Sequence, residues 1–192
     1  VSADVAEDDM VPHLRGADAL VHLAWIFQPT HRPEVTWRAN AVGSARLFEA
    51  AAAAGVPLVY VNRQPINVDS LPDNQAFVAS NEAESSRQGF IEQCNQWAAA
   101  GKTEVSVYVM QGELSNQAAV QRTQNYYDVM DAGKCAVTVN IIDEQTANWS
   151  RDQAQNLMTN WLSTGTAFDG LLANNDEMAI GAIQAMKAAG ID

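Results

Sequence analysis

The chain has 192 residues, of which 47% are hydrophobic, and a formal net charge of −12 at pH 7. This length holds one sizeable domain or two small ones, and the apolar content is ordinary for a protein with a packed core. The acidic charge, with no run of Lys or Arg, disfavours a nucleic-acid partner, and no apolar run is long enough to predict a membrane span. The first ten residues show no basic or apolar region, so we expect no signal peptide in this chain.

The apolar patterns predict strands that alternate with helices along the chain. The expected strands are residues 19–24, 57–61, 76–80, 104–110, 135–142 and 170–174. The expected helices are residues 36–55, 81–101, 116–132, 150–163 and 176–189, and the polar stretch 64–74 is expected to be a loop or hinge. This alternation predicts an α/β protein, a Rossmann-like three-layer sandwich with a mostly parallel sheet.

The chain has two cysteines, Cys94 in a predicted helix and Cys135 at the start of a predicted strand. Their spacing matches no metal-binding motif, and we expect no metal site. A disulfide between them stays open as an alternative. Two separate buried or half-buried thiols are the preferred interpretation, because free cysteine is among the most buried residue types.

Three segments in the first third of the chain carry a family resemblance. They are "ADALVHLAW" (17–25), "NAVGSARLFEAAAAAG" (40–55) and "LVYV" (58–61). They resemble the fourth strand, fourth helix and fifth strand of the extended short-chain dehydrogenase/reductase family, which includes nucleotide-sugar epimerases. The resemblance implies that Asp4 lies near an adenine ring and that Asn40 supports an active site. From its place in a strand, His22 is expected to be a packed or hydrogen-bonded core residue rather than a base.

The sequence departs from that family at the positions that its chemistry needs. It has no glycine-rich turn to hold a pyrophosphate at a helix N-terminus. Asn62 and Arg63 stand where the family has its serine, and neither Tyr126 nor Tyr127 has a lysine four positions later. That lysine would lower the pKa of the tyrosine that exchanges a proton. We therefore expect no cofactor, no catalytic residue and no enzymatic activity.

From residue 57 to residue 192 the sequence resembles another family. The segments "LVYVNRQPINVDS", "MQGELSNQAAVQRTQNYYDVM", "DEQTANWSRDQAQNLM" and "GLLANNDEMAIGA" are similar to periplasmic sugar-binding proteins of ABC transporters, nearest to the ribose and inositol types. The resemblance implies two α/β lobes that close on a monosaccharide between them. It also implies that the chain crosses a hinge after "VNRQP".

This second resemblance implies five sugar-contacting residues. Arg63 and Arg122 match arginines that donate hydrogen bonds to sugar hydroxyls, which suits a planar fork of donors. Asn62 stands where many relatives have an aspartate, Trp149 matches an aromatic residue that stacks on a sugar face, and Asn175 matches an amide that binds hydroxyls. Each has a plainer alternative: exposed charges for the arginines, a core position for Trp149 and a helix N-cap for Asn175.

Together these residues indicate a vestigial sugar site. It is expected to bind weakly, because the strands that complete the family's cleft are not in the sequence and an open cleft buries little of a ligand. The two resemblances meet at "GVPLVYV" (55–61). We therefore interpret the chain as an artificial or recombined chimera of a dehydrogenase-like fragment, residues 1–61, and a sugar-binding-protein lobe, residues 62–192, without catalytic activity of its own.

The alternative function is a residual module that binds a monosaccharide weakly. A nicotinamide-dependent oxidoreductase or epimerase is disfavoured by the missing motifs. The localisation stays open, because the two parent families are cytoplasmic and periplasmic. Also open is whether the two segments merge into one sheet or leave exposed sheet edges that form a homodimer.

Overall fold

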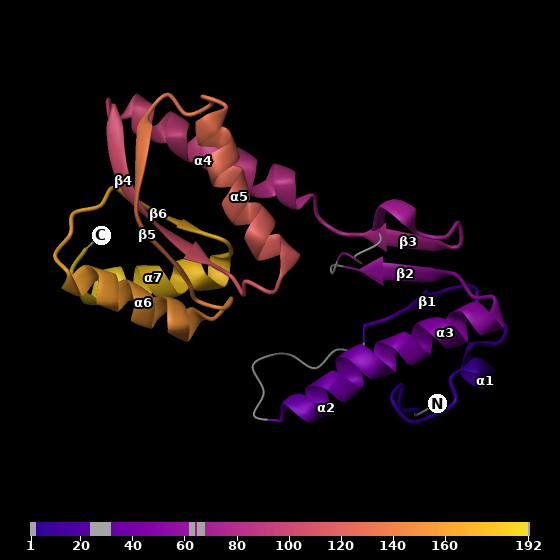
Figure 1. The fold of residues 1–192 in the computed structure, drawn as a ribbon. Coiled ribbons are helices and arrows are strands. Elements are labelled where there is room, and N and C mark those ends of the chain that lie inside the picture. The colour runs from indigo at the N-terminus through magenta and orange to yellow at the C-terminus, as the bar shows by residue number, and fades with distance from the viewer. Residues whose placement is uncertain (1–2, 24–31, 62–63, 65–67, 192) are drawn as a thin grey trace. The chain divides into compact units, whose positions relative to one another are not determined.

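The computed structural model describes residues 3–23, 32–61, 64 and 68–191. The chain divides into two compact units, Val1–Ser80 and Asn81–Asp192. Each unit has its own three-stranded sheet (Figure 1). Of the arrangements that the sequence left open, a single merged sheet is therefore wrong.

The first unit contains a parallel sheet in the order β1-β2-β3. The strands are β1 (Leu20–Val21), β2 (Leu58–Val61) and β3 (Gln75–Val78), and the helices are α1 (Val11–Leu14), α2 (Pro33–Trp37), the π-helical segment η1 (Arg38–Gly43), α3 (Ser44–Ala54) and the 3-10 turn η2 (Val68–Ser70). All four residues of β3 pair with β2. This pairing explains why the chain divides after Ser80, whereas the sequence placed the division between residues 61 and 62.

Helix α3 packs on one face of this sheet. Its buried residues Leu47, Ala50 and Ala51 form a core with Leu14 of α1 and with Val56. Because alternate residues of a strand point to opposite faces, not all apolar strand residues lie under α3. Three strand residues stay largely exposed: Val21 (54%), Val61 (41%) and Val78 (59%). That such apolar residues or the sheet edges support a homodimer stays a prediction.

His22 follows β1 and lies on the helix side of the sheet. Its Nε2 is 2.8 Å from Oγ of Ser44, and its ring meets the Phe48 ring edge-on. Burial lowers the pKa of His22 below its usual value, which favours the neutral imidazole. The structure thus confirms the packed and hydrogen-bonded role expected from the sequence.

The second unit is a three-layer sandwich, with a parallel sheet in the order β5-β4-β6. Its strands are β4 (Glu104–Gln111), β5 (Thr138–Thr146) and β6 (Gly170–Ala173), and its helices are α4 (Glu82–Ala99), α5 (Gln117–Asp131), α6 (Arg151–Ser163) and α7 (Asp176–Ala188). Helices α4 and α5 cover one face of the sheet, and α6 and α7 cover the other (Figure 1). This arrangement confirms the α/β, Rossmann-like three-layer fold class.

The central strand β4 shows why the sheet is covered on both faces. Val105, Val107 and Val109 belong to the core under α4 and α5. Tyr108 and Met110 belong to the core under α6 and α7. A central parallel strand is buried on both sides and so reads as a nearly continuous apolar run, as in "VSVYVM", where Ser106 is the one polar residue.

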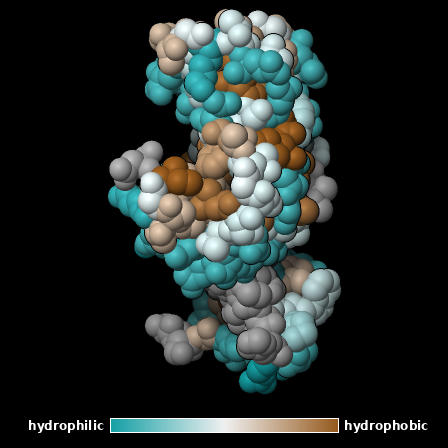
Figure 2. Space-filling model, turned by 90° about the vertical axis from the view of Figure 1, so that its left-hand side faces the viewer, coloured by the Kyte–Doolittle hydropathy of each residue, from teal (hydrophilic) through white to brown (hydrophobic). Residues whose placement is uncertain are grey.

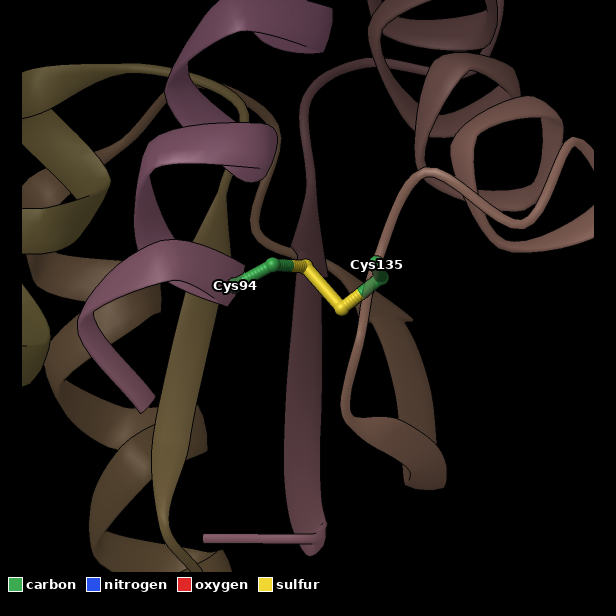
Figure 3. Close-up of a disulfide and its surroundings, with 2 residues drawn as sticks. All are labelled: Cys94 and Cys135. Atoms are coloured by element: carbon green, nitrogen blue, oxygen red, sulfur yellow. A yellow bond between two sulfur atoms is a disulfide. The ribbon is translucent and has the colours of Figure 1, made fainter. Parts of the chain in front are cut away.

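A disulfide joins Cys94 of α4 to Cys135 in the segment before β5 (Figure 3). The preferred sequence interpretation, two separate thiols, is therefore wrong. Cys94 is buried in the core beneath α4 and α5 and Cys135 packs against the same core, which brings the two Cα atoms to 5.3 Å, within disulfide range. Strand β5 begins at Thr138, so Cys135 lies ahead of the strand rather than at its start.

The surface mixes polar and apolar residues, as the face in Figure 2 shows. Large apolar residues that the structure exposes in the second unit include Leu114 and Val120, which are 55% and 53% exposed. Among the described residues, no helix has the length and apolar character to cross a membrane.

Candidate functional site

The topology of the second unit points to one end of its sheet. From β4 the chain runs through α5 to β5 on one side, and from β5 it runs through α6 to β6 on the other side of β4. In open α/β sheets, ligands bind beyond the carboxyl ends of the strands where the connections diverge in this way. Gly112 directly follows β4 and Asn174 directly follows β6, so these residues mark the candidate site.

Asn174 ties the ends of the two strands together. It is 4% exposed, and its Oδ1 accepts hydrogen bonds from the backbone N–H of Gly112 at 3.0 Å and from the hydroxyl of Thr123 at 3.3 Å. The backbone N–H of Asn174 donates to the carbonyl oxygen of Met110 at 3.0 Å. The sequence analysis did not single out Asn174. The signal was there, since a polar residue at the end of a buried strand needs hydrogen-bond partners.

Arg122 projects from α5 to the same place. Its Nη1 donates to the backbone carbonyl of Asn174 at 2.7 Å, and its Nε donates to the carboxylate of Glu82 on α4. The guanidinium carbon lies 5.8 Å from the centre of the Trp149 ring. Arg122 is therefore not the freely exposed charge of the plainer alternative, because its side chain is only 23% exposed and held from two sides.

Trp149 lies in the loop between β5 and α6. It has φ of +62°, and Asn148 before it has φ of +52°, a left-handed conformation that bulky residues seldom adopt. The loop is fixed by Thr146, whose hydroxyl donates to the carbonyl of Gly112 at 2.6 Å. A Cβ atom on Gly112 would lie 2.2 Å from the indole ring, so only glycine leaves room for the tryptophan.

The Trp149 ring packs against the core beneath α6 and α7, so the core alternative holds for part of the side chain. Its Nε1–H, in contrast, is buried without an acceptor among the described residues. A buried indole N–H normally finds a hydrogen-bond partner. Among the described residues of the site, this donor near Arg122 and the side-chain amide nitrogen of Asn174 are the buried polar groups that lack a hydrogen-bond partner.

Asn175 is the N-cap of α7. Its Oδ1 accepts the backbone N–H of Met178 at 3.0 Å, so the structure shows the N-cap alternative. A sugar contact through the amide nitrogen of Asn175 stays a prediction. Asn62 and Arg63 lie outside the described residues, and their predicted sugar contacts stay predictions too.

Burial raises the pKa of Tyr126, whose hydroxyl lies 3.5 Å from the carbonyl oxygen of Ala173. Hydrogen bonding with Asn174 and the positive charge of Arg122 oppose that rise. The phenol is therefore neutral near pH 7 and serves as a packed core group of α5.

The first unit has a surface hollow of about 500 Å³. It is lined by Asp8, Asp9, Met10, Val11, Arg46, Glu49, Ala50 and Ala53. These lining residues include no aromatic side chain and none of Arg122, Trp149 and Asn175. The candidate site therefore rests on the strand ends of the second unit.

Comparison with known proteins gives a family for this chain. Residues 36–192 match the model of the "Periplasmic binding protein domain". The chain belongs to this family. A "Putative rhizopine-binding protein" of Rhizobium meliloti is 56% identical over 140 residues, which are 73% of this chain and 44% of that protein. A "Xylitol-binding protein" of Mycolicibacterium smegmatis is 30% identical over 141 residues, 73% of this chain and 37% of that protein.

A solved structure gives the same result at the level of the fold. The ABC transporter solute-binding protein from Bacillus halodurans C-125, with bound myo-inositol, superposes with a TM-score of 0.65 at 27% identity. The match covers 94% of this chain and 54% of that one. The chain thus spans less than half the length of the two curated relatives and about half of this structure.

These matches bear on the interpretation of the chain as a chimera. Residues 36–61, which also resemble the short-chain dehydrogenases, lie inside the family match. The matches give no support to a dehydrogenase fragment or to a junction between two families. Because Rossmann-like proteins share helix-strand units of similar pattern, likeness over one such unit does not distinguish the families.

Proposed function

We propose that the second unit holds part of a binding site for a monosaccharide or a polyol of similar size, in a solute-binding protein of an ABC transporter. The similar proteins support this class of ligand, since they include a xylitol-binding protein and a structure with bound myo-inositol. Relatives of this kind bind and deliver solutes, which supports a role without catalysis for this chain.

The observation that carries the proposal is the buried N–H of Trp149 without an acceptor among the described residues. It lies where the topology predicts a ligand, and the loop that holds it adopts a left-handed backbone. A sugar hydroxyl is a suitable acceptor for this N–H and can also accept from Arg122. We assign Trp149, Arg122 and Asn175 to this site, and we keep Asn62 and Arg63 as further predicted contacts.

The disulfide supports a periplasmic location for the protein. Disulfides persist in oxidising compartments such as the periplasm and are rare in the cytosol. The link between Cys94 and Cys135 is consistent with that setting. The competing interpretation, an inactive chimera, has no observation in the structure that favours it.

Isothermal titration calorimetry with D-ribose, xylitol and myo-inositol tests the proposal. We expect weak binding of at least one of them, because the chain spans only part of its relatives. Trp149→Phe keeps an aromatic ring but removes the N–H, and we expect it to weaken binding about tenfold, the effect of one hydrogen bond to a ligand.

Trp37→Phe is the matched control, because Trp37 lies on α2 of the first unit and is 70% exposed. It should leave binding unchanged. No heat of binding for any of the three ligands, with the wild type folded, would overturn the proposal. If the wild type and Trp149→Phe bind the ligand equally well, the ligand binds somewhere other than at the strand ends.

A further inference from the structure

Glu82 is the first residue of α4, and its carboxylate accepts the Nε–H of Arg122. The pair is mostly shielded from solvent, with side-chain exposures of 13% for Glu82 and 23% for Arg122. A charge pair of this kind is screened far less than an exposed one. Neither the sequence patterns nor the family resemblance pointed to Glu82.

The backbone around Glu82 is itself fixed. The side chain of Asn81 caps α4 by accepting the N–H of Glu84 at 3.1 Å. Asn125 of α5 is 3% exposed, and its amide nitrogen donates to the carbonyl of Glu82 at 2.9 Å and to the hydroxyl of Ser86 at 2.7 Å. The first turn of α4 is therefore anchored to α5, which also carries Arg122.

Glu82 and Asn174 together set the orientation of the Arg122 fork. Nε–H goes to Glu82 and Nη1 goes to the carbonyl of Asn174, so the plane of the guanidinium is defined by two partners on different elements. An arginine has five N–H donors in a rigid plane, so these two bonds also fix the direction of the others. Without Glu82, the long side chain would have only one of these anchors.

We propose that Glu82 positions Arg122 and selects ligands by charge, an inference that rests on the proposed polyol site. Its carboxylate neutralises the guanidinium, and Glu113, at the carboxyl end of β4, adds a further negative charge. Among the described residues, the strand ends therefore offer hydrogen-bond donors whose positive charge is balanced by carboxylates. Such a site accepts neutral sugars and polyols, and it repels sugar phosphates and sugar acids, whose negative charge would have to be desolvated beside carboxylates.

The test uses the variant Glu82→Gln, with the pairs D-ribose and D-ribose 5-phosphate, and myo-inositol and myo-inositol 1-phosphate. Glu84→Gln is the matched control, because Glu84 lies in the same helical turn and pairs with Arg87 instead of Arg122. We expect Glu82→Gln to weaken binding of the neutral ligand about tenfold and to raise the phosphate-to-neutral affinity ratio at least about tenfold. Glu84→Gln should change neither.

A second readout needs no ligand. The Nε–H proton of an arginine exchanges slowly when it is held in a shielded hydrogen bond, so we expect a protected Arg122 Nε–H signal in the nitrogen-15 NMR spectrum of the wild type. Glu84→Gln should keep the signal, and Glu82→Gln should lose it. A signal that persists in Glu82→Gln would overturn the positioning role whether or not a sugar binds.

The outcomes separate the inference from the function on which it rests. If the wild type binds a neutral ligand and Glu82→Gln keeps both its affinity and its ratio, the inference is wrong and the proposed function stands. If the wild type binds neither neutral ligand, both the function and the charge selection fall.

Discussion

The disulfide between Cys94 and Cys135 gives the sharpest stability prediction for this protein. It joins α4 to the segment before β5, and both cysteines lie in the second unit. Cys94 is 1% exposed and packs with Phe90 and Trp97 in the core beneath α4. Breaking the bond leaves this packing largely in place but releases a chain constraint across the edge of the sheet.

The size of the effect follows from the sequence separation of 41 residues. In the chain-entropy model, a cross-link that closes a loop of this length restricts the unfolded chain by about 4 kcal/mol. Domains of this size are usually stable by only about 5–15 kcal/mol. Reduction is therefore expected to remove a large share of the stability of the second unit and to lower its melting temperature by about 15 °C.

Urea unfolding followed by circular dichroism, with and without dithiothreitol, measures this loss. The double variant Cys94→Ala/Cys135→Ala should unfold like the reduced wild type and should not respond to the reductant. The first unit has no cysteine, so its own transition should stay where it is in all samples. An unfolding midpoint of the second unit that is the same in oxidised and reduced wild type would refute the reasoning.

Two further predictions concern packing and pH in the second unit. A Cβ atom on Gly181 would lie 2.2 Å from the backbone oxygen of Arg151. Gly181→Ala should therefore lower the free energy of unfolding, measured by urea titration, by about 1–3 kcal/mol. Gly89 lies in a helix with open space around it, so Gly89→Ala should raise the free energy of unfolding by up to about 1 kcal/mol. Burial, with the adjacent Glu144 carboxylate, raises the pKa of Tyr127 to about 12, so its contribution to stability should be complete below pH 10 and be lost as the pH rises from about 10 to about 12. Ultraviolet titration of the tyrosines measures the pH at which Tyr127 ionises. If the ionisation at about pH 12 is still present in Tyr127→Phe, the assignment to Tyr127 is wrong.

The fold of the second unit could be predicted because its strands carry unambiguous local patterns. The run "VSVYVM" is apolar on both faces and became the central strand β4. Strand β5 extends to Thr146, beyond its expected end at residue 142, because the polar residues Asp143 to Thr146 still pair with β4. A strand that carries polar side chains at a sheet edge looks like a loop in the sequence.

The disulfide and the division of the chain depend on tertiary packing, which local patterns do not contain. Cys94 and Cys135, with a sequence separation of 41, meet only because both pack into one core beneath α4 and α5. The division after Ser80 follows from the pairing of β3 with β2. Burial alternates along β3 as it does along any half-covered strand, so the pattern of β3 does not reveal which sheet it joins.

The candidate site was predicted in part, for a reason that lies in the topology. Arg122 and Trp149 are 27 positions apart in the sequence, yet the structure brings them within cation–π range at the ends of parallel strands. The family resemblance indicated both residues. It did not indicate Asn174 or Glu82, because those residues are recognised by the groups that they hold and not by a motif.

The N-cap role of Asn175 is compatible with the sugar contact that is predicted for the same side chain. Its Oδ1 is used by the N–H of Met178 at the start of α7. An amide also has a nitrogen with two donors, which the cap does not use and which matches the acceptor oxygens of a sugar. An aspartate could cap the helix equally well but could donate nothing. Asparagine at this position therefore fits the proposed site, in which the strand end would both start a helix and offer a donor to a neutral ligand, whereas Asn175→Asp would keep the cap and remove the donor.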